Sequence, residues 1–110
     1  MAIILEIARH SPESFPGANE KARKVILEVF GQWDGLLKKH GVKVIGGWNV
    51  HPEHLAVMVY EAHSFEAFQK FRMEPEMDRL AYLQTIEIKV ASSAEDVLKF
   101  LKQMKQYHLN

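Results

Sequence analysis

The spacing of apolar residues changes repeatedly along the chain, and each change predicts a switch between strand and helix. Residues 2–9 alternate between two sets of side chains, which is typical of a half-buried strand. From Asn19 the apolar residues recur at intervals of three and four, which predicts an amphipathic helix with Asn19 as N-cap and Gly41 as left-handed C-terminal residue. The same reasoning predicts strands at 2–9, 42–50, 55–62 and 85–90, and helices at 19–40, 65–73 and 75–80, with a last helix after a capping box at Ser92 and Glu95.

The element order βαββαβ followed by a C-terminal helix predicts an α+β, ferredoxin-like antiparallel sheet with its helices on one face. The 110 residues leave room for a single domain over 1–110. The last helix is expected to bury Val97, Leu98, Leu101 and Met104. We expect the following strand residues to pack beneath the helices: Ile3, Leu5, Ile7, Leu55, Val57, Val59, Ile86, Ile88 and Val90.

The opposite sheet face then combines charged and apolar residues, which is expected where two sheets meet in a homodimer. By elimination, this face presents Ile4, Glu6, Ala8, His10, Ala56, Met58, Tyr60, Thr85, Glu87 and Lys89.

Composition excludes several classes of function. The 14 basic residues balance the 14 acidic ones, so the chain lacks the electrostatic footprint of a nucleic-acid-binding protein. The absence of cysteine excludes disulfides, thiolate metal sites and thiol nucleophiles. No apolar run approaches the ~20 residues of a membrane span, and the N-terminus does not read as a signal peptide. A cytoplasmic protein without membrane partners is therefore the expectation.

Two short motifs add a family resemblance. Gly46-Gly47-Trp48 on the second strand and the segment 61–68 (EAHSFEAF) after the third, together with the element order, resemble the dimeric α/β-barrel superfamily over residues 2–91. Within it the chain is similar to a small uncharacterised single-domain family. The superfamily includes cofactor-free monooxygenases, haem-degrading enzymes and muconolactone isomerases. The resemblance implies a homodimer more firmly than any chemistry, and no cofactor is expected.

One carboxylate beside a tyrosine in a semi-apolar pocket has the chemistry of a general base, because desolvation raises its pKa. The alternative is that these carboxylates pair with Lys89 across strands or across a dimer. The candidate acid–base groups are Glu6, His10, Tyr60 and Glu87.

Three histidines are expected at one end of the sheet, where the first and third strands lie side by side. His10, His51 and His54 would together suit a divalent transition metal, with Glu13 or Glu53 as an additional ligand. The alternative is a set of solvated turn histidines.

Aromatic residues of the first two helices and the second strand are either core or the lining of a pocket between helices and sheet. The ligand-binding candidates are Trp48, Met58 and Phe68. Three functions stay open: a homodimeric binding or interaction protein for a small apolar ligand, a cofactor-independent monooxygenase- or isomerase-like enzyme on an aromatic or polyketide-like substrate, and a metal-binding protein.

Overall fold

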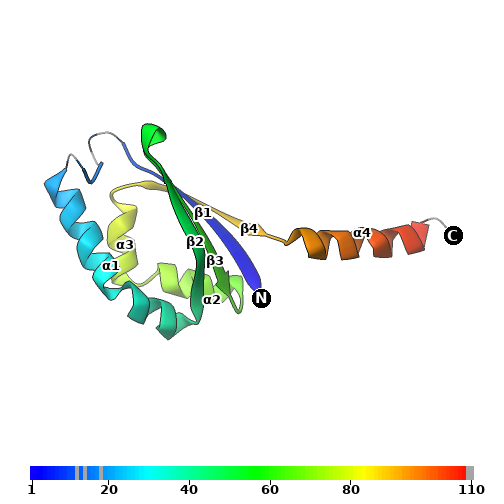
Figure 1. Ribbon diagram of the computed structural model, residues 1–110. Helices are drawn as coiled ribbons and strands as arrows, with labels where there is room; N and C mark the ends of the chain where they lie inside the picture. Colours follow the sequence, from blue (N-terminus) through cyan, green and yellow to red (C-terminus); the bar gives the residue numbers. More distant parts are fainter. Residues whose placement is uncertain (12, 14, 18, 109–110) are drawn as a thin grey trace.

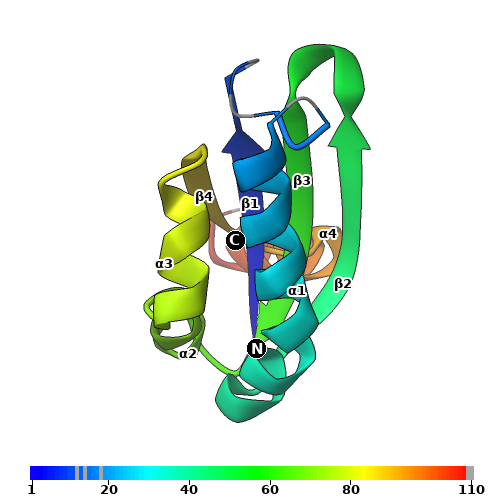
Figure 2. The same ribbon diagram turned by 90° about the vertical axis from the view of Figure 1, so that its left-hand side faces the viewer.

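The computed structural model describes residues 1–11, 13, 15–17 and 19–108, and in this part of the chain four antiparallel strands form one sheet in the order β2-β3-β1-β4 (Figure 1). Helices α1, α2 and α3 cover one face of this sheet, as the view onto that face shows (Figure 2). The predicted ferredoxin-like arrangement is therefore confirmed. The elements are β1 (Ala2–Arg9), α1 (Glu20–His40), β2 (Val42–Val50), the short 3-10 helix η2 (His51–Glu53), β3 (Leu55–Ala62), α2 (Phe65–Arg72), α3 (Pro75–Ala81), β4 (Thr85–Ala91) and α4 (Ala94–His108).

Helix ends follow the predicted capping chemistry, with one shift. The Asn19 side chain accepts a hydrogen bond from the Ala22 N–H at 3.0 Å, and Gly41 closes α1 at φ 64°. At α4, however, the cap is Ser93, whose Oγ accepts from the Asp96 N–H at 3.0 Å. The predicted capping box at Ser92 is thus displaced by one residue, because two serines stand in succession and either has the right side chain.

The sheet face beneath the helices is not the predicted one for β1 and β3. In β1 it is Ile4, Glu6 and Ala8 that are buried, and the register places Tyr60 and Met58 opposite the first two. The prediction failed because apolar residues stand at both the odd and the even positions of these strands. Alternation alone therefore cannot decide which face is buried. In β4 the predicted residues do lie on the helix side by register, since they pair with the buried side of β1, but Ile88 and Val90 stay 39% and 60% exposed there.

The sheet face opposite the helices, called the open face below, is consequently more apolar than predicted. The charged residues on it are confined to its margins, and its centre carries aliphatic side chains from the two middle strands. Residues of β1, β3 and β2 assigned to the open face by register are Ile3, Leu5, Ile7, Leu55, Val57, Val59, Trp48 and Val50.

The hydrophobic core lies between the sheet and the three covering helices. Tyr60 from β3 meets Phe68 and Phe71 from α2, with ring centroids 5.0 and 6.1 Å apart. Offset aromatic packing of this kind contributes beyond the area it buries, by about 0.5–1.5 kcal/mol a pair. Phe68 and Phe71 are fully buried, so α2 is fixed against the sheet by the side chains whose three-residue spacing predicted it.

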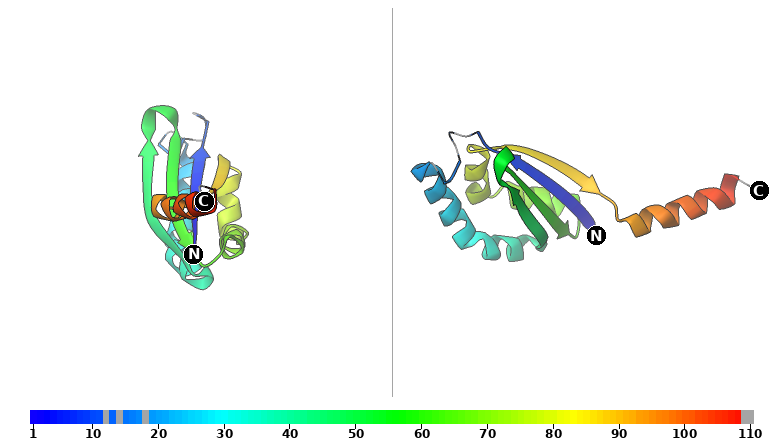
Figure 3. Two further views of the ribbon diagram at one scale, coloured as in Figure 1. Left: turned by 90° about the vertical axis from the view of Figure 1, so that its right-hand side faces the viewer. Right: turned by 45° about the horizontal axis from the view of Figure 1, so that its top comes forward.

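Helix α4 stands apart from this core. It leaves the end of β4 and projects away from the sheet on the side of the open face (Figures 1 and 3). The radius of gyration is 17.3 Å, against roughly 13 Å for a compact domain of this length. Val97, Leu98, Leu101 and Met104, which were predicted to be buried, are 40–57% exposed. No helix in the described ranges is long and apolar enough to cross a membrane.

Candidate functional site

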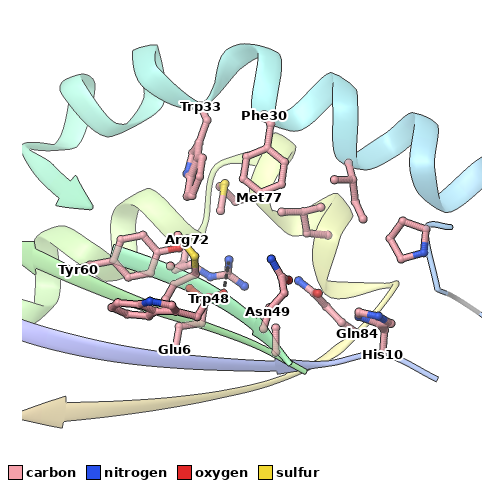
Figure 4. A pocket seen from close by; sticks show the side chains of 17 residues that line it. Glu6, His10, Phe30, Trp33, Trp48, Asn49, Tyr60, Arg72, Met77 and Gln84 are labelled. Atoms are coloured by element: carbon pink, nitrogen blue, oxygen red, sulfur yellow. Dashed lines mark ion pairs between the residues drawn. The ribbon is translucent and has the colours of Figure 1, made fainter. Parts of the chain in front are cut away.

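A cavity of about 470 Å³ lies between the sheet and the helices α1 and α3. Figure 4 shows α1 above it, with the side chains of β1 and β3 forming its floor. A volume of this size suits a small organic molecule. The residues that line it are Glu6, Ala8, His10, Pro16, Ile26, Phe30, Trp33, Gly47, Trp48, Asn49, Ala56, Met58, Tyr60, Arg72, Met77, Leu80 and Gln84.

The floor of the cavity holds a buried carboxylate. Glu6 is 4% exposed, and its Oε1 lies 3.3 Å from Nη1 of Arg72, which reaches it from the end of α2. The geometry of this contact is that of an ion pair without a hydrogen bond. Among the described residues neither Arg72 Nη1 nor the second oxygen of Glu6, Oε2, has a hydrogen-bond partner. Buried polar atoms are almost always hydrogen-bonded, so these two atoms stand out beneath the lining of the cavity.

Burial raises the pKa of Glu6 above its ordinary value of 4.5. Arg72 and a hydrogen bond from the Tyr60 hydroxyl act in the opposite direction and lower that pKa, but burial is the larger effect. The pKa of Tyr60 is itself raised, by its burial and by the charge of Glu6. The hydroxyl therefore stays protonated and donates a hydrogen bond to the carboxylate. A carboxyl group with a raised pKa, facing a cavity, is suited to accept or donate a proton near neutral pH.

The roof of the cavity is aromatic and comes from α1. Phe30 and Trp33 meet edge to face with ring centroids 4.5 Å apart, and Trp33 approaches Tyr60 at 6.4 Å. The indole Nε1 of Trp33 is buried without a hydrogen-bond partner in the described part of the chain. The cavity therefore has flat apolar walls, with a buried donor in its roof and a buried acceptor in its floor that make no hydrogen bond within the described residues.

Two glycines of β2 make room at the edge of the cavity. Gly47 lies opposite Met58, and a Cβ there would collide with the Met58 sulfur. Gly46 is covered by the indole of Trp48, which a Cβ would approach to 2.6 Å. The register after the bulge pairs Trp48 with Val57, so the backbone assigns Trp48 to the open face, and the residue is also among those that line the cavity.

A cluster of rings closes the end of the cavity near the loop after β1. His10 stacks on Phe15 with centroids 5.6 Å apart, and His54 meets Phe15 at 4.9 Å and His10 at 5.6 Å. Burial and the neighbouring His54 lower the pKa of His10. His54 adopts a left-handed backbone, φ 49°, at the end of η2. His10 is thus held neutral, and its Nε2 has no partner among the described residues.

The three predicted metal ligands do lie at one end of the sheet. His10, His51 and His54 border a neighbouring cavity of about 290 Å³. Within the described ranges, however, no three His, Cys, Asp or Glu side chains are arranged to hold a metal ion. Metal binding stays a prediction from the sequence.

The structure separates the other predicted site residues. Glu6, Tyr60, His10, Trp48 and Met58 all line the main cavity. Glu87 does not, because its register position opposite Ile7 places it on the open face. There it pairs with Lys89 at 3.7 Å, within the same strand rather than across strands as the alternative interpretation expected, and across strands with Arg9 at 3.6 Å. Phe68 belongs to the core, with no exposed surface.

Arg72 is the functional residue that the sequence analysis missed. Its signal was present, since it follows Phe68 by four residues and Phe65 by seven and so continues the buried stripe of α2. A cation on an apolar helical stripe predicts a buried anion nearby, because unpaired charges are not tolerated in a core.

Comparison with known proteins supports the fold. No protein-family model and no curated protein matches the chain. Among solved structures, protein Atu4242 from Agrobacterium tumefaciens aligns with a TM-score of 0.58 at 16% identity, over 86% of this chain and 94% of that one. An uncharacterised NIPSNAP domain protein from Burkholderia xenovorans aligns with a TM-score of 0.55 at 13% identity, over 86% and 95%. An antibiotic biosynthesis monooxygenase aligns with a TM-score of 0.54 at 11% identity, over 86% and 99%.

The chain shares the α+β, ferredoxin-like fold of these proteins, as the resemblance to the dimeric α/β-barrel superfamily predicted. At these identities the likeness concerns the fold, and the chemistry of the cavity rests on this chain's own side chains.

The environment of Glu6 predicts its titration. The chemical shift of its carboxyl carbon, followed by NMR as the pH is varied, should titrate with a midpoint above pH 4.5. Arg72→Met and Tyr60→Phe should each raise it further, because each removes an interaction that lowers the pKa. Arg9→Met, on the open face, is the control and should leave it unchanged. A midpoint at or below 4.5 would contradict the burial described here.

The same shift predicts a pH dependence of stability. The folded state holds the Glu6 proton more tightly than the unfolded state does. The stability of the protein relative to Glu6→Gln should therefore decline as the pH rises from 4.5 through the folded-state pKa. Urea unfolding at a series of pH values measures this difference.

Proposed function

We propose that this protein binds a small, flat, largely apolar molecule carrying a hydroxyl or carbonyl group in the cavity beneath α1, and that it does so as a homodimer. The observation that carries the proposal is a cavity of about 470 Å³ whose lining combines aromatic and aliphatic side chains with three residues that bear polar groups, Glu6, Arg72 and Trp33. Sites of this composition use apolar walls for affinity and a few polar groups for orientation.

The polar atoms define the ligand's polar edge. Glu6 Oε2 accepts a hydrogen bond from a hydroxyl, while the Trp33 indole and the Arg72 guanidinium donate to a carbonyl or an oxyanion. The edge-to-face pair of Phe30 and Trp33 suits an aromatic ring system. A phenol fused to a second ring satisfies both requirements.

The homodimer is proposed from the open face. Its centre consists of Leu5, Ile7, Val57 and Val59 from the two middle strands, and no helix of the chain covers it (Figure 3). A continuous apolar sheet face is expected to be covered in solution. The fold shared with the dimeric α/β-barrel superfamily supports a second copy as the cover.

A catalytic role is the second candidate, favoured by the raised pKa of Glu6 and its free oxygen. Glu6 in its ionised form would remove a proton from a hydroxyl or from a carbon next to a carbonyl. Arg72 and Trp33 would stabilise the resulting oxyanion by donating hydrogen bonds. One structural neighbour is an antibiotic biosynthesis monooxygenase, which is consistent with such a proton transfer as the first step on an aromatic substrate.

Binding is tested with 2-naphthol, a fused bicyclic phenol. We expect it to quench the tryptophan fluorescence saturably, with Trp33 in contact with the ring. Ala56→Leu, which adds three carbons to the cavity wall, should weaken binding by about ten-fold or more, because a filled cavity leaves less room for the ring. Isothermal titration calorimetry gives the dissociation constants.

The matched control is Ala81→Leu, the same substitution at an exposed position of α3. It should bind like the original protein. Equal affinity of both leucine variants would show that 2-naphthol binds elsewhere and would contradict the proposed site.

Proton transfer is tested with 2-tetralone, whose C1 protons are activated by the adjacent carbonyl. Their exchange for deuterium, followed by NMR, should rise with pH through the pKa of Glu6. Glu6→Gln should slow it by about 100-fold or more, the range that a positioned base supplies. Glu87→Gln, on the other sheet face, is the matched control. Exchange that survives Glu6→Gln would remove the catalytic candidate and leave the binding proposal standing.

A further inference from the structure

Helix α4 carries an apolar stripe that no other described residue of its chain buries. Every side chain described in it, from Ala94 to Met104, is exposed. Apolar residues recur along it at intervals of three and four, which is the pattern of a helix with one buried side. Their exposed fractions are 44% for Val97, 57% for Leu98, 59% for Phe100, 52% for Leu101 and 40% for Met104.

Helix α4 begins directly after the sheet. Only Ser92 and Ser93 separate it from β4, and Ser93 caps the helix through both its Oγ, which accepts from Asp96 N–H, and its carbonyl, which accepts from Val97 N–H at 3.1 Å. The cap holds the first turn of α4 in helical form within two residues of the sheet. As it stands, α4 extends away from the open face, as the view onto that face and the side views show (Figures 1 and 3).

The length of α4 matches the thickness of a second copy. Its 15 residues span about 22 Å at 1.5 Å per residue. Two stacked sheets lie about 10 Å apart, and a layer of helices adds about as much again. If a second copy packs on the open face, an α4 that leaves this face is long enough to pass the sheet of the second copy and to reach that copy's helices.

The area of the open face points the same way. Four strands of about eight residues cover a projected surface of roughly 500 Å². Stable interfaces bury about 800 Å² on each partner. Because accessible surface exceeds projected area, the open faces approach the size that such an interface needs, and the stripe of α4 adds apolar area to it.

We infer that α4 is an exchanged arm. In the proposed dimer, on which this inference rests, each α4 packs its apolar stripe against the sheet and helices of the second copy. The lysines of its other side stay in water, as Lys99 does in its pair with Glu95 at 3.7 Å. The arm then contributes to the dimer interface as a second contact region beyond the open face.

Light scattering and amide hydrogen exchange on the full chain test the arm. We expect a dimer in which the amides of α4 are protected and lose protection on dilution. Leu101→Gln should weaken the dimer by about ten-fold or more, because each copy loses a buried leucine. Lys102→Gln changes the neighbouring residue on the polar side and should leave the dimer unchanged.

Each alternative outcome overturns the inference in a different way. A dimer with unprotected α4 amides, or one that tolerates Leu101→Gln, leaves the proposed dimer standing and removes the arm. A monomer with unprotected α4 removes the dimer as well. A monomer with protected α4 shows that the helix folds onto its own sheet. A last outcome can be read from NOEs in a dimer of labelled and unlabelled chains. If Leu101 shows intermolecular NOEs only to α4 of the other copy, the two α4 helices pair with each other, and the exchanged arm is excluded.

Discussion

The ion pair between Glu6 and Arg72 is the contact on which the arrangement of the whole sheet depends. Breaking such a pair inside a protein costs about 3–5 kcal/mol, because the remaining charge stays buried. Glu6 sits in the central strand and is 4% exposed, so its partner has to come from the covering helices. Once Glu6 faces the helices, Ile4 and Ala8 face them too, and Ile3, Leu5 and Ile7 are directed to the opposite side.

This choice of face divides the molecule into two surfaces with different tasks. Beneath α1, a single chain encloses the acid–base group, its hydroxyl partner Tyr60 and an aromatic roof. On the other side, an aliphatic sheet face and the stripe of α4 offer contacts suited to a second copy. The ligand site and the proposed interface are thus separated by the thickness of one sheet, so the cavity is complete within one chain while the interface needs two.

The sequence predicted the elements well because their signals are local. Asn19, Gly41 and Ser64 cap the helices as expected, and the four strands lie where alternation placed them. Alternation could not decide which face of β1 is buried, since Ile3, Ile4 and Leu5 are apolar in succession. The decisive residue was Arg72, whose effect on Glu6 depends on a tertiary contact 66 positions away in the sequence. The exposed position of α4 likewise has no signal in its own sequence, whose apolar stripe predicted burial.

The face of the sheet that Tyr60 occupies tests this account most directly. NOEs between ring protons of Tyr60 and of Phe68, whose centroids are 5.0 Å apart, are expected in the protein without ligand. The methyl groups of Val57 and Val59 should show no NOE to Phe68. The reverse pattern, with the valines against Phe68 and Tyr60 on the open face, would place Glu6 outside the core and contradict the account.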